Sequence, residues 1–329
     1  MTLLDLLGAW RSALPLLVVS TTVASAALIF AFGDHRTRLR AVVGLGGPAL
    51  TLALVAALVA GVRAGERFEA RLPFLPGEDI LLRADALSVL FVGLSATLWL
   101  ITTIYAFGYL REGPNRPRFF GFFALCVSAT MGVALAGNLV TFVVFYELLT
   151  LATYPLVVHR GDRETLRAGR IYLLYTLSGG ALLLLGAMLL HAWHGAGAFE
   201  VGGLLALAEA RPGDAALRLL FALMIAGLGV KAALVPLHGW LPLAMVAPAP
   251  VSALLHAVAV VKAGAFGIVR VVYDLFGVSL AEALGVLPWL AGAAAATVIW
   301  GSLLALRQDD LKKRLAYSTV SQVSYIALG

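Results

Sequence analysis

Cysteine is almost absent from this chain. The single one, Cys126, excludes an intrachain disulfide among its 329 residues. Paired cysteines of the CxxC kind, which hold metal ions, and the CxxCH sequence that attaches haem are missing too. No haem, flavin or quinone motif appears either. We therefore expect no metal site, no bound cofactor and no catalytic residue for redox chemistry in this chain.

Charge is scarce as well, since only 13% of the residues are charged whereas soluble domains carry about 25%. Hydrophobic residues make up 61% and the mean hydropathy is +0.95. A water-soluble surface needs polar residues to cover it, so this composition excludes a soluble protein and indicates several membrane crossings. The net charge of +6 does not indicate nucleic-acid binding, because the basic residues lie in short loops between apolar runs.

A spanning helix needs about 20 mostly apolar residues, and about ten segments satisfy this. The sequence therefore predicts an all-α fold, a polytopic transmembrane helix bundle of about ten helices with a broken seventh helix. Short alternating runs around Leu75, Pro76 and Gly77 predict a small β-hairpin on the outer face. The segments are 13–32, 41–62, 85–110, 119–137, 139–158, 170–191, 217–235, 251–276, 286–306 and a last one opening near Leu315.

The basic residues of the loops indicate the orientation. Loops after the odd-numbered segments carry fourteen lysines and arginines, and those on the other side carry seven. Cytoplasmic loops are enriched in these residues, so we expect the N-terminus outside. The first apolar stretch has full membrane length and no clear cleavage sequence, so we interpret it as a retained helix rather than a signal peptide.

Lys231 stands inside the seventh segment, where a lysine costs about 2.5–3.5 kcal/mol at mid-helix. Only four residues separate it from Pro236, and Pro242 follows. Proline removes a backbone donor and breaks the helix, and broken helices at mid-membrane recur in ion sites. Burial favours a neutral lysine while a nearby carboxylate favours the charged form, so lysine can gain and lose a proton there. The alternative is a side chain that snorkels to the interface.

Glu147 is the acidic residue placed deepest within a span, in the fifth segment. Intramembrane acids are uncommon and usually line proton or ion paths. A carboxylate there is the natural partner of Lys231, since each group sets the other's charge. The alternative is a glutamate that a neighbouring Ser or Tyr holds for packing.

His256 and Lys262 share the eighth segment. If the segment is one α-helix, the two side chains point about 120° apart and lie about 9 Å apart along the helix axis. They would then be successive stops on a proton path rather than one ligand cluster. Histidine titrates near neutrality and can relay protons. The alternatives are a hydrogen-bonded packing histidine and a structural lysine. Glu147, Lys231, His256 and Lys262 together form the hypothesis of a buried proton path.

Four stretches resemble the proton-translocating antiporter family, which includes Mrp sodium/proton antiporter subunits and the antiporter-like subunits of complex I and membrane-bound hydrogenases. The resemblance covers nearly the whole chain, and it implies that Glu147 and Lys231 form the key pair and that His256 and Lys262 continue the path. The stretches are FVVFYELLTLATYPLVV, GVKAALVPLHGWLPLAM, APAPVSALLHAVAVVKAGAFGIVR and DDLKKRLAYSTVSQVSYIALG.

Two departures from the family pattern bear on function. Leu243 stands where the family usually has an acid in the sequence WLPDA. The family also builds a longer bundle from two inverted halves, and this chain ends within the tenth helix, so we expect a C-terminal truncation. The expected organisation is a single antiporter-like domain over 1–329, with N-terminal helices to 110, a five-helix repeat at about 119–276 and an incomplete second repeat at 286–329.

The resemblance implies a proton- or monovalent-cation-translocating component of a multisubunit complex in a bacterial cytoplasmic (inner) membrane, most closely an Mrp-type antiporter. The expected partners are other membrane subunits, the lipid bilayer, protons and, as a candidate, Na⁺, with no nucleic acid. One alternative is a proton-pumping component of a complex I or hydrogenase-type NADH:quinone oxidoreductase. Another is a structural membrane component without transport, which Leu243 and the missing second half favour.

Overall fold

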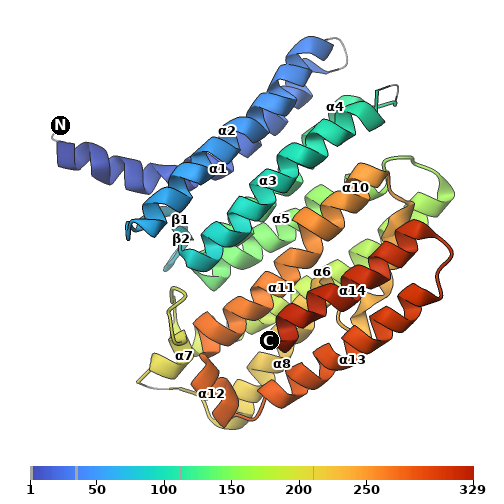
Figure 1. Cartoon of the computed structure of the whole chain (residues 1–329). Helices are drawn as coiled ribbons and strands as arrows, with labels where there is room; N and C mark the ends of the chain where they lie inside the picture. The colour runs from blue at the N-terminus through green and yellow to red at the C-terminus, as the bar shows by residue number, and fades with distance from the viewer. Residues whose placement is uncertain (1–2, 34–35, 112, 210) are drawn as a thin grey trace. The chain divides into compact units, whose positions relative to one another are not determined.

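The computed structural model describes residues 3–33, 36–111, 113–209 and 211–329. The chain divides into two compact units. Unit 1 comprises Met1–His159 and Pro248–Ala259, and unit 2 comprises Arg160–Ala247 and Val260–Gly329. This division rests on spatial contacts, so the repeat boundaries expected from the sequence stay a prediction. Figure 1 shows the helices that make up both units.

Most of the described chain is helical, and nine of its helices are long and apolar enough to cross a membrane. The helix expected to be the tenth, α14 (Leu311–Leu328), forms but is not among the nine, because three basic residues lie in its first turns. The nine are Trp10–Phe32, Thr37–Arg63, Ala86–Tyr109, Arg116–Leu135, Leu139–Val157, Arg163–His194, Asp214–Val246, Ala249–Phe276 and Leu287–Leu306. The polytopic helical architecture predicted from the sequence is thus confirmed.

Unit 1 is built around α4 (Arg116–Leu135), which contacts α1 (Leu3–Phe32), α3 (Ala86–Tyr109) and α5 (Leu139–Val157). Its sequence is apolar all round, and such a helix belongs in the interior. Glycine lets the neighbours come close, since a Cβ at position 132 would overlap the ring of Phe145 on α5. The remaining long helix, α2 (Thr37–Arg63), packs on α1 and α3.

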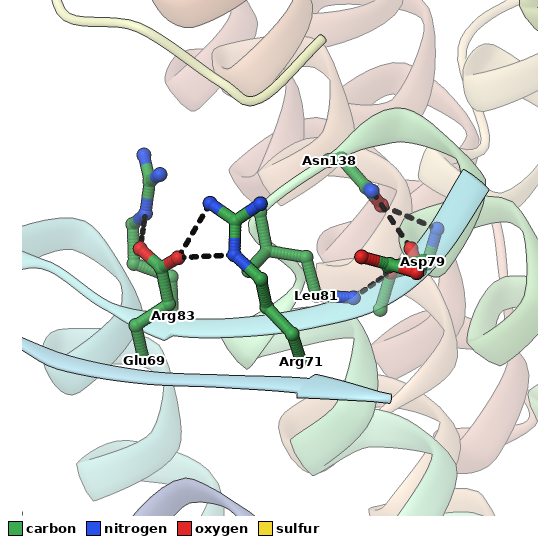
Figure 2. A network of polar contacts seen from close by, with 7 residues as sticks. Glu69, Arg71, Asp79, Leu81, Arg83 and Asn138 are labelled. Carbon is green, nitrogen blue, oxygen red and sulfur yellow. Dashed lines mark hydrogen bonds and ion pairs between the residues drawn. The ribbon is translucent and has the colours of Figure 1, made fainter. Parts of the chain in front are cut away.

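The predicted hairpin is present in unit 1, as strands β1 (Phe68–Leu75) and β2 (Glu78–Ala84). Gly77 takes the left-handed conformation (φ +82°) that the tight turn after Pro76 requires. Figure 2 shows how β2 is fastened to the turn between α4 and α5. Asn138 donates to the carbonyl oxygen of Asp79 (2.9 Å), and the backbone N–H of Leu81 donates to the Thr141 hydroxyl (2.7 Å).

An ion-pair cluster spans the two strands of this hairpin (Figure 2). The Glu69 carboxylate lies 2.7 Å from Arg71 and 3.1 Å from Arg83. Partial burial raises the pKa of Glu69, but the hydrogen bonds and charges of Arg71 and Arg83 outweigh it, so the net pKa shift is downward. The cluster therefore stays ionised and holds the strands in register.

Four helices begin with a side-chain cap from the residue just before them. In each case the side-chain oxygen accepts from a backbone N–H two or three residues ahead, which satisfies a donor that the helix leaves unpaired. Asp85 accepts from the N–H of Ser88, Asn138 from that of Thr141, and Asp162 from that of Thr165. Asp310 accepts from the N–H groups of both Lys312 and Lys313.

In unit 2, α6 (Arg163–His194) packs against α8 (Asp214–Ala232), with glycines at the contact. A Cβ at Gly227 would lie 2.6 Å from the carbonyl oxygen of Gly179, so the backbones approach as closely as small residues allow. Figure 1 shows α13 (Leu287–Leu306) and α14 running side by side in opposite directions. Two short helices, α7 (Leu204–Leu207) and α12 (Val278–Ala283), lie in connections.

The seventh span is broken, as the sequence predicts. Helix α8 ends at Ala232, four residues before Pro236, whose ring would clash with the Ala232 carbonyl if the helix continued. Ala233 then takes a left-handed conformation (φ +59°). The chain resumes as short helical pieces, which are η1 (Leu237–Gly239), α9 (Trp240–Leu243, with Pro242 inside it) and η2 (Ala244–Val246).

The eighth span is helical but not one α-helix, which corrects the sequence interpretation. Its pieces are α10 (Ala249–Ala253), the π-helical η3 (Leu254–Val258), α11 (Val260–Arg270) and the π-helical η4 (Val271–Phe276). Ala259, between η3 and α11, leaves the helical region (φ −120°, ψ −84°). The 120° angle expected between His256 and Lys262 assumed an unbroken α-helix, and that assumption is wrong.

Candidate functional site

Lys231 is fully buried in unit 2, with 0% of its surface exposed. It lies in the last turn of α8, one residue before the helix ends. Helix α11 packs against this turn so closely that a Cβ at Gly264 would overlap the backbone nitrogen of Ala232. A lysine is rarely buried to this extent. The helix C-terminus offsets part of the cost, because its carbonyl dipoles favour a positive charge.

The broken end of α8 is held by specific hydrogen bonds rather than left loose. The carbonyl oxygen of Val230 accepts from the indole Nε1 of Trp240 (2.7 Å) and from the backbone N–H of Ala233 (3.1 Å). Beyond the break, the N–H of Val235 donates to the Thr297 hydroxyl (3.0 Å), which itself donates to the Ala293 carbonyl oxygen (2.7 Å). These contacts fix the backbone on both sides of Lys231.

Lys262 is half-buried on α11, the helix that packs against the turn holding Lys231. It stands two residues before Gly264, so it projects about 200° round the helix from the face that touches α8. The two lysines therefore lie on neighbouring helices of unit 2, and Lys262 is on a different face of α11 from the one that contacts α8.

Glu147 and His256 belong to unit 1, and both are half-buried. Glu147 follows the fully buried Tyr146, whose ring stacks on that of Phe142, one turn earlier on α5 (5.5 Å). His256 lies in the π-helical η3, which packs on α3, where the Ser95 hydroxyl donates to the Val258 carbonyl oxygen (3.3 Å).

Each unit thus carries two of the four residues singled out from the sequence, Glu147 and His256 in unit 1, Lys231 and Lys262 in unit 2. Their proposed roles as proton carriers stay a prediction. Within the described ranges, no three His, Cys, Asp or Glu side chains gather into a group that could hold a metal ion.

The sequence analysis overlooked a buried ion pair in unit 2. Arg270 Nη1 lies 2.6 Å from Asp274 Oδ2, and the two side chains are only 4% and 14% exposed. The guanidinium also lies over the rings of Phe266 (5.1 Å) and Phe199 (5.5 Å). A charge pair at four-residue spacing near the end of an apolar segment was the signal that could have identified it.

The turn before α14, which carries acidic and basic residues, contacts the chain that follows the broken seventh span. Asp310 caps α14, and Lys312 donates to the carbonyl oxygen of Ala247, at the end of the broken seventh span (2.6 Å). Burial, followed by the charge of Arg160, lowers the pKa of Lys312, whereas Asp310 raises it. The turn therefore attaches α14 to the pieces that follow the break.

Comparison with known proteins adds a family match. The family described as NADH:quinone oxidoreductase/Mrp antiporter, TM, matches residues 136–329. That range includes Glu147, Lys231, His256 and Lys262.

Individual relatives agree with this match. The chain is 34% identical over 288 residues to a probable K(+)/H(+) antiporter protein of Rhizobium meliloti, covering 86% of this chain and 28% of that protein. It is 35% identical over 248 residues to the NAD(P)H-quinone oxidoreductase chain 5 of a Picosynechococcus species, covering 74% and 37%. This chain therefore spans well under half the length of these relatives.

A solved structure is similar as well. The Mrp complex from a Dietzia species contains a chain that matches with a TM-score of 0.80 and 27% identity, over 95% of this chain and 34% of that one. The similar proteins are thus subunits of multisubunit membrane assemblies.

Proposed function

Because this integral membrane chain belongs to the NADH:quinone oxidoreductase/Mrp antiporter transmembrane family, we propose that it translocates protons and a monovalent cation as one subunit of a membrane complex. An Mrp-type cation/proton antiporter is the function we favour. It is supported by the antiporter relative in Rhizobium meliloti and by the similar chain in the Dietzia Mrp complex.

The observation that carries this proposal is the fully buried Lys231 at the end of an interrupted helix. A lysine amine can exist charged or neutral in a low-dielectric site, whereas arginine stays charged. A carboxylate that becomes ionised favours the ammonium form, and its protonation favours release. We propose that Glu147 and Lys231 are coupled in this way, and that a proton released from Lys231 passes to His256 and Lys262.

The test is transport by the complete complex in proteoliposomes, with an interior pH dye as the readout. Glu147→Gln and Lys231→Ala should each reduce translocation to background while the subunits still co-purify. Lys231→Arg should do the same, because it keeps the charge but cannot release the proton. Glu282→Gln and Lys313→Ala, at exposed positions, are matched controls that should transport normally. Transport that survives any of the first three variants would refute the proposal.

The oxidoreductase alternative is favoured by the similarity to NAD(P)H-quinone oxidoreductase chain 5. In that case the same residues would move protons, and electron transfer in partner subunits would supply the energy. Acidification driven by NADH oxidation, rather than by a cation gradient, would identify this alternative. A structural component without transport is favoured by Leu243, where an acid is usual in the family, and would show no pH change under either driving force.

We also propose a bacterial cytoplasmic membrane with the N-terminus outside, on the basis of the basic residues in the loops. Single cysteines at Arg71, in the hairpin, and at Arg163, at the start of α6, would test this orientation. A membrane-impermeant maleimide added to intact cells should label the first position and not the second. The native Cys126 is buried and should not react.

A further inference from the structure

Unit 2 carries a groove of about 670 Å³ that does not include any of the four proposed proton carriers. Helices α8 and α13 form its walls, and Leu234, Val235 and Leu237 from the broken segment lie at one end. Arg218 on α8 donates to the carbonyl oxygen of Leu284, just before α13 (2.9 Å), and the N–H of Val235, in the broken segment, donates to the Thr297 hydroxyl on α13 (3.0 Å). The groove is therefore a built feature of the unit, of a size that ordinarily receives a ligand.

The charge of the groove is concentrated in one residue. Of the described residues that line it, Arg218 is the only charged one, and the others are apolar or glycine. Arg218 is exposed, and its Nε donates to the Leu284 carbonyl oxygen. Because this hydrogen bond fixes the Nε donor, the guanidinium is held at the mouth of the apolar groove. A ligand that complements these features has an anionic group at one end and a long apolar body.

The position of Arg218 relative to the membrane agrees with this. It lies in the second turn of α8, and Trp289, which is 81% exposed, stands in the first turn of α13. Exposed tryptophan and arginine at the ends of spans are typical of the lipid headgroup level.

We propose that this groove is a binding site for one anionic phospholipid. The Arg218 guanidinium binds the phosphate, and an acyl chain lies along α8 and α13 as far as the broken segment. Free phosphate would leave the apolar length unfilled, and a neutral lipid would gain less from Arg218. The lipid would then contact Val235 and Leu237, and so it would support the backbone that follows Lys231.

The experiment uses the purified complex in nanodiscs of phosphatidylcholine with a minor fraction of phosphatidylglycerol that carries a photoactivatable acyl chain. Label should map to peptides that contain 221–237 and 286–293. Arg218→Gln should weaken this labelling about fivefold, the value of one arginine near an anionic headgroup. Arg218→Lys should retain part of it. Arg211→Gln is the matched control, an exposed arginine near the same helix end that does not line the groove.

Two further measurements test whether the label depends on the groove and on the lipid headgroup. Ala222→Trp should exclude the chain from the groove and remove the label, and Ala293→Phe serves the same purpose if the first variant does not fold. The same photoactivatable chain on phosphatidylcholine should label these peptides at least severalfold more weakly. Equal labelling by the two lipids, or unchanged labelling of Arg218→Gln, would show a groove filled only by bulk lipid and would overturn the proposal. None of these arms depends on transport activity.

Discussion

The indole nitrogen of Trp240 donates a 2.7 Å hydrogen bond to the carbonyl oxygen of Val230, the residue just before the buried Lys231. The bond closes across the break in the seventh span, from α9 back to the last turn of α8. Trp240 is itself fully buried, and its ring meets that of Tyr172 edge-on (5.5 Å). The orientation of the broken helix end thus depends on a residue nine positions after the lysine.

Replacing Trp240 by phenylalanine should destabilise the protein. The aromatic packing is partly kept, but the indole donor is lost, and a net hydrogen bond contributes about 1 kcal/mol. The Val230 carbonyl retains the Ala233 N–H, so the cost should stay near that value in denaturant unfolding of the detergent-solubilised protein. Trp300→Phe, at an exposed position, is the control and should change stability by less than about 0.5 kcal/mol. Equal effects of the two variants would contradict the role of the bond.

Gly264→Ala should disturb the site by overpacking. The new Cβ would overlap the backbone nitrogen of Ala232 and lie 2.8 Å from the carbonyl carbon of Lys231, and backbone atoms cannot rotate away. We expect a loss of about 1–3 kcal/mol in the free energy of unfolding, together with reduced proton transport. Gly292→Ala, in open space on α13, should be neutral or stabilising by up to about 1 kcal/mol. A Gly264→Ala protein as stable as wild type would contradict the close approach.

The buried Arg270–Asp274 pair should be costly to break from one side only. Asp274→Leu leaves the guanidinium buried without its carboxylate, which typically costs about 3–5 kcal/mol. The double variant Arg270→Met/Asp274→Leu removes both charges and should recover most of that loss. The measurement is a double-mutant cycle of unfolding free energies. Additive effects of the two substitutions would show that the pair contributes no coupling.

His159 should make stability depend on pH in the acidic range. Burial, followed by the charge of Arg118, lowers the pKa of His159 below its ordinary 6.5, although a backbone hydrogen bond to Pro114 opposes the shift. The unfolded state then binds more protons between the lowered pKa and 6.5, so stability falls as the pH drops through that window.

The comparison protein is His159→Phe, which can keep the edge-on ring contact with Phe119 but cannot be protonated. The stability of wild type relative to this variant should decrease as the pH falls below 6.5 and level off once the folded-state histidine is protonated. A difference that stays constant across the window would contradict the lowered pKa.

The parts of this structure that could be predicted from sequence are those with a local physical cause. Apolar runs of membrane length predicted the spans, Pro236 predicted the break, and Pro76 with Gly77 predicted the hairpin turn. The burial of Lys231 also followed from its place in an apolar run.

The remaining features depend on packing between distant segments. The π-helical turn at Leu254–Val258 contains neither glycine nor proline, so no local residue indicated it, and the assumption of one α-helix through His256 and Lys262 was wrong for that reason. The Trp240–Val230 bond and the contact of Gly264 with Ala232 join residues that periodicity cannot relate. Only the folded chain brings these residues together.

The capped helix starts have a consequence for biosynthesis. Asp85, Asn138, Asp162 and Asp310 each find their partner N–H within three residues, so each of these caps can form once the first turn of its helix has left the ribosome. A polytopic chain enters the bilayer one segment after another, and unpaired backbone groups are penalised strongly in hydrocarbon. Helices α3, α5, α6 and α14 can therefore start at a defined residue before any later segment has been synthesised.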